Sequence, residues 1–273
     1  MNYRSFACSE KGAEHEKNNM PCQDSAVDYI DNDLLIVVIA VADGHGSAEC
    51  FRSEKGSRFA VECAVECIKK FICAVSENSI SIEDKQGELL TQLSNSIITS
   101  WNDKVEKDYI NNPFIPDIQY KVEEVIENKK EYIEQAYGTT LVAAALTDNY
   151  WFGLQIGDGK CAVLRGDGTF YQPIPDDEKC FMNITTSMCD YNVSQEFRYC
   201  FGVDKPFAIF IGTDGVDNSF EDDEQLYELY RCMLNDFANK GFDTEVEEIK
   251  KFLPVLTKKG SGDDVSIAGI IAV

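Results

Sequence analysis

The chain has 273 residues, with 48 acidic and 25 basic side chains and a formal net charge of −23. Its apolar content of 44% is ordinary for a globular protein, so a chain of this length can bury a large core. Such an acidic surface repels phosphate backbones and anionic lipid, which argues against nucleic acid and membrane as the main partners.

The longest uninterrupted apolar run, Leu34 to Ala42, is about half as long as a membrane-spanning helix. The first residues also lack the apolar region of a secretory signal, so we expect a cytoplasmic protein. The 11 cysteines are odd in number and show no paired CxxC spacing, which predicts neither a disulfide framework nor a zinc site. Cys63 and Cys67 share a helix face and are predicted to fill the core.

The first half of the chain predicts a strand and three helices. The run from Leu34 to Ala42 is rich in β-branched residues and indicates a strand buried on both faces. A helix is expected next, with Ser47 as its cap, Glu49 in its first turn and an apolar stripe that recurs every four residues to Phe71 and Ile72. Two more helices are expected at about 84–109 and 122–136.

The second half predicts mainly strands. Tight turns at 148–149, 157–159 and 166–168 separate short apolar segments from Thr139 onwards, and such loops favour an antiparallel meander. A strand at 207–211, a helix near 223–239 and a closing strand at 265–273 follow. Since the helices do not alternate with the strands, we expect an α+β fold in which a central β-sandwich of two antiparallel sheets lies between helices. No linker or repeat appears, so residues 1–273 are predicted to form a single domain.

Five aspartates stand where an apolar strand or turn ends. Each alone is typical of a turn, but a carboxylate at a buried strand end costs several kcal/mol unless a cation or hydrogen bonds compensate it. Together the five indicate carboxylates that converge on a metal: Asp24, Asp43, Asp158, Asp214 and Asp263.

The donor types select the metal and the chemistry. Carboxylate and carbonyl oxygens suit Mg²⁺ or Mn²⁺, and His15 and His45 are too few for a histidine-rich zinc or iron centre. Two such ions about 3.5–4 Å apart clamp a phosphoryl group and lower the pKa of a water, so the pattern favours phosphate hydrolysis. His45, two residues after Asp43, is placed to protonate the leaving oxygen, a role worth about 10²–10⁴ in rate. Walker A, GxSxG, HExxH and GxGxxG motifs are absent.

Several motifs together resemble one family. In order along the chain, the segments VADGHGS, GTTLVAAAL, IGDGKCAVLR, FIGTDGVDN and SGDDVSIAGIIAV resemble the motifs of metal-dependent protein phosphatases of the 2C type. The entry Cys22-Gln23-Asp24, preceded by His15, is similar to a bacterial-type branch of that family. The resemblance implies a four-layer α/β/β/α sandwich and a phosphoserine or phosphothreonine protein as substrate.

The resemblance also implies roles for single residues. Asp43 bridges two Mg²⁺ or Mn²⁺ ions, Gly44 contributes its carbonyl, and Asp214 and Asp263 complete one ion's ligands. Asp24 acts on the second ion, directly or through water. Asp158 helps to hold a labile third ion, His45 is the general acid, and Asp217 supports the ligands from behind.

Two positions depart from the family pattern. Gln23 stands where many members carry a glutamate, and Asn19 stands where many carry a phosphate-binding arginine. His15 and Lys17 are the leading candidates to replace that cation in binding the substrate, with Arg4 as a third.

Three hypotheses for the function remain open at this point. The first is an active phosphoprotein phosphatase; the second is a catalytically weak or inactive pseudophosphatase that binds phosphoproteins; the third is hydrolysis of a nucleotide or another small phosphate ester. The segment from Tyr171 to Gly202 is expected to form a flap near the site. The substrate and the oligomeric state cannot be inferred from the sequence.

Overall fold

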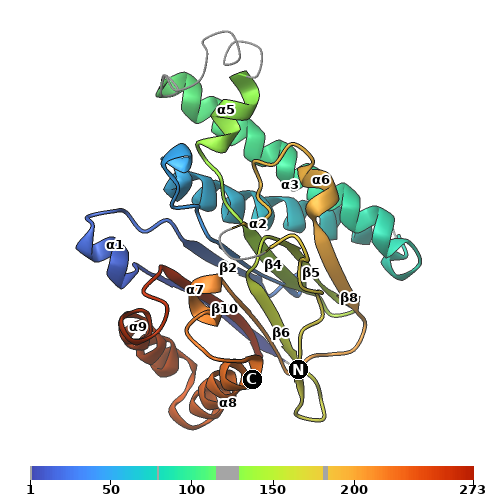
Figure 1. The fold of residues 1–273 in the computed structure, drawn as a ribbon. Coiled ribbons are helices and arrows are strands. Elements are labelled where there is room, and N and C mark those ends of the chain that lie inside the picture. Colours follow the sequence, from blue (N-terminus) through green and yellow to red (C-terminus); the bar gives the residue numbers. More distant parts are fainter. Residues whose placement is uncertain (1, 79, 115–128, 181–183) are drawn as a thin grey trace.

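The computed structural model describes residues 2–78, 80–114, 129–180 and 184–273. Its strands form two five-stranded sheets (Figure 1). Every pairing within them is antiparallel. The first sheet has the order β1 (Tyr3–Glu10), β10 (Val265–Ala272), β9 (Ala208–Gly212), β6 (Lys160–Leu164) and β7 (Phe170–Tyr171). The second has the order β2 (Ser25–Asp31), β3 (Ile36–Ala42), β4 (Leu141–Leu146), β5 (Trp151–Ile156) and β8 (Arg198–Gly202).

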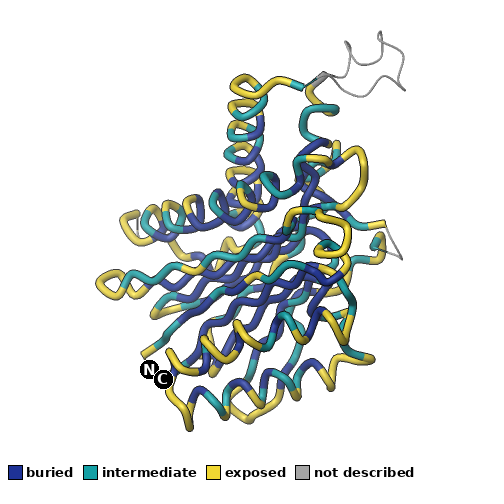
Figure 2. Tube along the Cα trace, turned by 90° about the vertical axis from the view of Figure 1, so that its left-hand side faces the viewer, coloured by how far each residue is buried: buried dark blue, intermediate teal, exposed yellow. Residues whose placement is uncertain are grey.

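Helices cover the outer face of each sheet. The second sheet lies against α2 (Ser53–Glu77) and α3 (Ile82–Asn111), and the first lies against α8 (Asp223–Lys240) and α9 (Phe242–Lys259). Buried residues form continuous bands along the strands, and each long helix turns a buried stripe inwards (Figure 2). The shorter helices are α1 (Ala13–Lys17), η1 (Ala48–Cys50), α5 (Lys129–Gln135), α6 (Val193–Glu196) and α7 (Asp214–Asp217). The predicted four-layer α/β/β/α fold is confirmed.

Strand β3 shows why the two sheets pack face to face. Alternate side chains of a strand point to opposite faces, and in β3 both faces are apolar and buried. Val38 and Ala40 pack towards α2, whereas Ile39 and Val41 pack against the first sheet. The prediction of a strand buried on both faces is therefore confirmed, but its start was placed too early. Leu34 and Leu35 lie in the turn after β2, 58% and 55% exposed.

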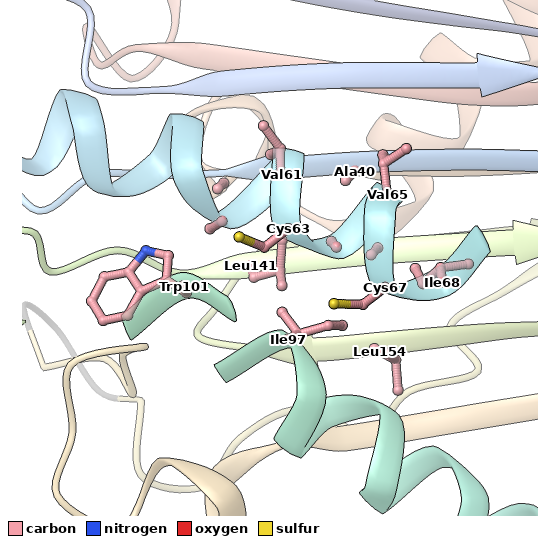
Figure 3. Close-up of a cluster of buried hydrophobic side chains, with 14 of the residues drawn as sticks. Ala40, Val61, Cys63, Val65, Cys67, Ile68, Ile97, Trp101, Leu141 and Leu154 are labelled. Carbon is pink, nitrogen blue, oxygen red and sulfur yellow. The ribbon is translucent and has the colours of Figure 1, made fainter. Parts of the chain in front are cut away.

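The two cysteines of the predicted stripe are part of the core under α2. Cys63 and Cys67 are buried and unpaired, beside Trp101 and Ile97 of α3 and Leu141 of β4 (Figure 3). Burial raises the pKa of the Cys63 thiol to about 12. The prediction that these thiols act as small apolar side chains is confirmed.

Three expectations about the helices need correction. Ser47 precedes the short η1 without capping it through its side chain, and the long helix begins only at Ser53, because residues 43–52 first cross the rim of a cavity. Helix α9 was missed: Pro254 lies inside it and Gly241 separates it from α8, so the pattern resembled a loop. Of the helix expected at 122–136, residues 122–128 lie outside the described part, and α5 covers 129–135.

The predicted meander is also wrong at one turn. Strands β4 and β5 pair as expected, but β5 and β6 belong to different sheets. The turn between them crosses from one sheet to the other, with Gly157 at φ 94°. Gly159 then lies so close to the first sheet that a Cβ on it would be 2.7 Å from the Gly212 carbonyl oxygen. The strands β1, β2 and β8 were not predicted.

The pairings bring distant segments to one edge of the sandwich. In the second sheet Ser25 pairs with Ala42, so Asp24, just before β2, and Asp43, just after β3, lie at the same end of this strand pair. In the first sheet Gly212 pairs with both Lys160 and Ile267. Asp158, Asp214 and Asp263 therefore reach the same edge. No helix among the described residues is long and apolar enough to cross a membrane.

Candidate functional site

A polar cavity of about 610 Å³ opens at this edge. It is lined by four of the five predicted aspartates and by both histidines of the chain: Asp43, Asp158, Asp214, Asp263, His15 and His45. Residues 184–185 of the segment between β7 and β8 form part of its wall, where a flap was expected. No lysine or arginine of the described residues lines it.

Asp43 is the electrostatic centre of the cavity. It directly follows the last residue of β3, and two hydrogen bonds join its backbone to Thr140, just before β4. The Asp43 N–H donates to Thr140 Oγ1 at 3.0 Å, and the Asp43 carbonyl accepts from the Thr140 N–H at 2.8 Å. Burial raises the pKa of the Asp43 carboxyl well above its ordinary value, and the charges of Asp24, Asp214 and Asp263 raise it further. Carboxylates from four separate segments therefore converge here, as the sequence predicted.

Asp24 lies beneath the cavity floor. Its side chain is buried, and Oδ2 accepts a hydrogen bond from Thr213 Oγ1 at 2.7 Å, whereas Oδ1 has no partner among the described residues. Burial raises the pKa of Asp24 to about 8; the Thr213 hydrogen bond opposes this rise, and the nearby Asp264 charge adds to it. A carboxyl group whose pKa is raised in this way is mostly protonated at neutral pH, so a cation that binds it displaces the proton.

Asp214 begins α7, directly after β9 and Thr213. Burial raises its pKa to about 7, and the charges of Asp158 and Asp263 contribute. Asp217, one turn further on, is paired instead with Lys160, whose Nζ lies 3.0 Å from Oδ1. Lys160 also contacts Asp223. Asp217 therefore does not line the cavity, and its charge is compensated by Lys160.

His45 lies on the cavity wall, with its backbone N–H donating to the Gly138 carbonyl at 3.1 Å. Its ring Nε2 is 2.8 Å from Ser187 Oγ. Burial lowers the pKa of His45, and the Asp158 carboxylate opposes that effect. The ring therefore lines the cavity and is held there by its contact with Ser187.

The three side chains considered as replacements for the phosphate-binding arginine lie in different places. His15 lines the cavity, with Nδ1 2.9 Å from Oδ1 of the buried Asp264, although the two groups are not aligned as a hydrogen bond. Lys17 is 67% exposed and pairs with Glu14 outside the cavity. Arg4 pairs with Asp243 beside α9. Only His15 is therefore available to a ligand in the cavity, because the other two point to solvent and to neighbouring carboxylates.

Gly44 and Gln23 are held together at the cavity floor. The Gly44 N–H donates to the Gln23 carbonyl at 3.1 Å, and a Cβ on Gly44 would lie 2.7 Å from both the Gln23 and Ser53 carbonyl oxygens. Only glycine fits this close approach of three backbone segments. The Gln23 amide donates to Ser53 Oγ at 2.7 Å, whereas its Oε1 is buried without a partner among the described residues.

The donor set fits divalent cations that prefer oxygen. Two buried oxygens, Asp24 Oδ1 and Gln23 Oε1, lack a hydrogen-bond partner in the described part of the chain, and the carboxylates around Asp43 carry uncompensated charge. No group of three or more His, Cys, Asp or Glu side chains among the described residues is placed so that it could hold a metal ion as a ready-made cage. Mg²⁺ does not require such a cage, because it binds through one or two carboxylates and keeps several waters.

Three residues at the site were missed by the sequence reading. Lys160 directly follows the predicted turn, Ser187 comes from the expected flap, and Asp264 is the neighbour of the predicted ligand Asp263. The Asp-Asp pair before a buried strand offered a signal, because strand alternation turns consecutive side chains to different environments. Nothing in the sequence indicated that Ser187 meets His45, which lies 142 positions away.

The comparisons with known proteins place this geometry in a family. A family model described as protein phosphatase 2C matches residues 11–253. No curated protein matches the sequence significantly. Similar solved structures include PppA of Pseudomonas aeruginosa, with a TM-score of 0.61 and 16% identity over 100% of this chain and 99% of that one.

Two other bacterial structures are similar to the same extent. The serine/threonine phosphatase PstP/Ppp of Mycobacterium tuberculosis has a TM-score of 0.58 and 15% identity, with 99% of each chain covered. The S. agalactiae serine/threonine phosphatase has a TM-score of 0.56 and 14% identity, with 100% of each chain covered. These structures share the fold, and the family model covers most of the sequence. The chain belongs to the protein phosphatase 2C family.

Proposed function

We propose that this chain is a Mg²⁺- or Mn²⁺-dependent phosphatase that hydrolyses phosphoserine and phosphothreonine in proteins, and that residues 1–273 act as one phosphatase domain. The observation that carries the proposal is the convergence of Asp24, Asp214 and Asp263 on Asp43 at the floor of an open cavity. A buried cluster of this charge has no purpose in a mere scaffold, because it destabilises the fold until cations neutralise it. The family and the folds of the bacterial phosphatases support the same activity.

The aspartates are proposed as ligands for two cations and a labile third. Asp43 would help to hold both of the first two ions, with the Gly44 carbonyl as a further donor. Asp214 and Asp263 would complete the ligands of one ion, Asp24 would act on the second, and Asp158 would help to hold the third. When bound, such ions supply a water of lowered pKa and neutralise the phosphoryl oxygens. A solved PstP structure is described as a complex with two manganese ions, which supports this choice of metal. Asp217 and Gln23 are proposed to support the ligands from behind.

The remaining residues handle the substrate. His45 is proposed to give its proton to the departing serine or threonine oxygen, a role worth about 10²–10⁴ in rate. His15 is proposed to contact the phosphate in place of the missing arginine, since it lines the cavity beside the carboxylate of Asp264. Lys17 is not proposed for this role, because it pairs with Glu14 outside the cavity. Cytoplasmic location and the lack of nucleic-acid or membrane partners stay predictions.

No feature of the site favours the pseudophosphatase hypothesis. All five aspartates and the histidine of the proposed machinery reach one edge of the sandwich, so a loss of chemistry has no structural cause here. The open cavity does not by itself separate a phosphoprotein from a small phosphate ester, and the experiment below does.

The test is phosphate release from a phosphothreonine peptide, a nucleotide and a sugar phosphate at equal concentrations. We expect release from the peptide that requires Mn²⁺, stops with EDTA and falls at least about tenfold in Asp43→Asn. Asp33→Asn is the matched control, because it removes an exposed charge at the opposite end of β3. Peptide binding without release would identify a pseudophosphatase, and faster hydrolysis of the small esters would exclude a protein substrate.

A further inference from the structure

Ser187, in the segment between β7 and β8, has its side chain in contact with a proposed catalytic group. Its Oγ lies 2.8 Å from Nε2 of His45, and the serine is only 3% exposed. We propose that Ser187 is a positioning residue that holds the His45 ring by Nε2, so that Nδ1 delivers the proton to the leaving group. The inference rests on the proposed phosphatase function. It adds which atom of His45 donates the proton and which residue orients the ring.

The surroundings of Ser187 orient its hydroxyl. The Thr139 N–H lies 3.2 Å from Oγ, and the Thr139 carbonyl lies at the same distance on the other side. The Ser187 hydroxyl donates to that carbonyl, so Oγ is left to accept the Nε2–H of the His45 ring over the shorter distance of 2.8 Å. This bond does not depend on whether Nδ1 carries a proton. One serine can therefore hold Nε2 in both states of the ring.

The packing around the ring leaves little freedom for other arrangements. A Cβ on Gly138 would lie 2.8 Å from Cδ2 of His45 and 2.9 and 3.2 Å from the sulfurs of Cys50 and Cys189. The ring edge and the two thiols therefore all lie close to the Gly138 backbone. Within the described part of the chain, Ser187 is its sole hydrogen-bonding partner, so Nδ1 is left for the substrate.

The proton transfer can be written explicitly. As a water oxygen bonds to phosphorus, the bond from phosphorus to the serine or threonine oxygen of the substrate breaks, and its electron pair stays on that oxygen. The oxygen takes the proton from Nδ1, and the N–H electron pair remains on the ring. Nε2 keeps its proton throughout, held by Ser187 Oγ. Without the hydroxyl, the ring can turn, and in a fraction of enzyme–substrate complexes Nδ1 no longer points at the leaving oxygen.

The test compares substrates that differ in their need for a proton. Phenolate is a poor leaving group and needs protonation, whereas para-nitrophenolate leaves as a stabilised anion. We expect Ser187→Ala to lower kcat on phenyl phosphate and on a phosphothreonine peptide by about 10–100-fold, part of what a general acid contributes, and to change kcat on para-nitrophenyl phosphate much less. Ser194→Ala, an exposed serine of α6 in the same segment, is the matched control and should change neither rate.

A double-mutant cycle then assigns the effect to His45. His45→Ala should show the same substrate pattern, and Ser187→Ala should cost nothing more in the His45→Ala background, because the two groups act as a unit. An equal loss on both aryl phosphates, or additive losses in the cycle, would overturn the inference while leaving the phosphatase function intact. A wild-type protein inactive on every phosphoester with Mn²⁺ would overturn both.

A spectroscopic measurement covers the case in which Ser187→Ala is too unstable for kinetics. The chain has only two histidines, so their ring ¹⁵N signals can be assigned with a His15→Gln variant. With the ring neutral, we expect the wild type to show His45 as the Nε2–H tautomer and Ser187→Thr, which keeps a hydroxyl, to retain it. A mixture of tautomers in the wild type would contradict the inference.

Discussion

Asp263 and Asp264 are consecutive in sequence and face opposite environments. Asp263 is exposed at the cavity, whereas Asp264 is only 2% exposed and accepts the backbone N–H groups of Gly12 and Gln23 while contacting His15. The step into β10 produces this difference, since successive side chains of an extended chain alternate. One carboxylate is therefore available to a ligand, and its neighbour ties the N-terminal segment to the C-terminal one.

The pair predicts two different phenotypes from the same substitution. Asp264→Asn should lower the free energy of unfolding by about 2–4 kcal/mol, because an amide nitrogen cannot accept both buried N–H groups. Asp263→Asn should change metal-free stability by less than about 0.5 kcal/mol and weaken Mn²⁺ binding roughly tenfold. Urea unfolding in EDTA and calorimetric titration with Mn²⁺ measure the two quantities. Equal effects of both variants on stability would contradict the division of roles.

The acidic cluster predicts how stability depends on pH without metal. The folded-state pKa values of Asp24 and Asp214 are about 8 and about 7, above the value of about 4 expected for an unfolded chain. Between these values the folded state keeps protons that the unfolded state has lost. Stability should therefore fall as the pH rises from about 4, by up to about 1.4 kcal/mol per pH unit for each carboxyl, and level off above about 8.

Divalent cations should remove this loss, because they bind the deprotonated carboxylates. Scanning calorimetry in EDTA and in saturating Mn²⁺ should show a larger gain in Tm from Mn²⁺ at about pH 8 than at about pH 6. Asp24→Asn should flatten the metal-free dependence, and Asp33→Asn, an exposed control, should not. A metal-free Tm that rises over this range would contradict the buried cluster.

The sequence predicted the sheets better than the connections between them. Apolar strands such as β3 and β4 were visible because both of their faces are buried, which leaves continuous runs of apolar residues. The half-exposed β2, with its mixed pattern, was not visible. The crossing at Gly157 could not be distinguished from a hairpin, because a positive-φ glycine serves both.

The candidate site was likewise predicted only in part from the sequence. The aspartates were found because each stands in a turn or next to the end of a strand, and strand ends meet at sheet edges. Their neighbours Lys160, Ser187 and Thr213 were not found, because they are ordinary residues that matter only through their contacts with Asp217, His45 and Asp24. Lys17 was favoured as a phosphate-binding residue for its charge, and its distance from the cavity depends on the orientation of α1, which sequence spacing does not specify.

Replacing Lys160 should strengthen metal binding and weaken substrate binding. Its ammonium lies 3.0 Å from Asp217 and compensates that charge behind the ligands. Lys160→Met leaves the pKa of Asp217 to rise further through burial and adds net negative charge near the cavity. We expect Mn²⁺ to bind about threefold or more tightly and KM for a phosphopeptide to rise by a similar factor, as for a partly buried pair worth about 1 kcal/mol.

The control for this prediction is Lys250→Met, which removes an exposed lysine paired with Glu247 on α9. It should change neither quantity beyond the effect of net charge on the whole surface, which added salt screens. Weaker Mn²⁺ binding together with a higher KM in Lys160→Met would show that the lysine acts through folding rather than through its charge.

Gly44 predicts a loss of site geometry without a change of charge. A Cβ there would lie 2.7 Å from the Gln23 and Ser53 carbonyl oxygens, both of them backbone atoms that cannot move independently of their strands. Gly44→Ala should therefore cost about 1–3 kcal/mol in unfolding free energy, in the range of overpacking, and should displace the Gly44 carbonyl proposed as a ligand. Gly166→Ala is the control, because its nearest neighbour is a Phe207 ring atom 4.0 Å away. Urea unfolding and Mn²⁺ titration of both variants decide the matter: if Gly44→Ala is as stable and binds Mn²⁺ as tightly as Gly166→Ala, the close approach at the cavity floor is not a constraint on the site.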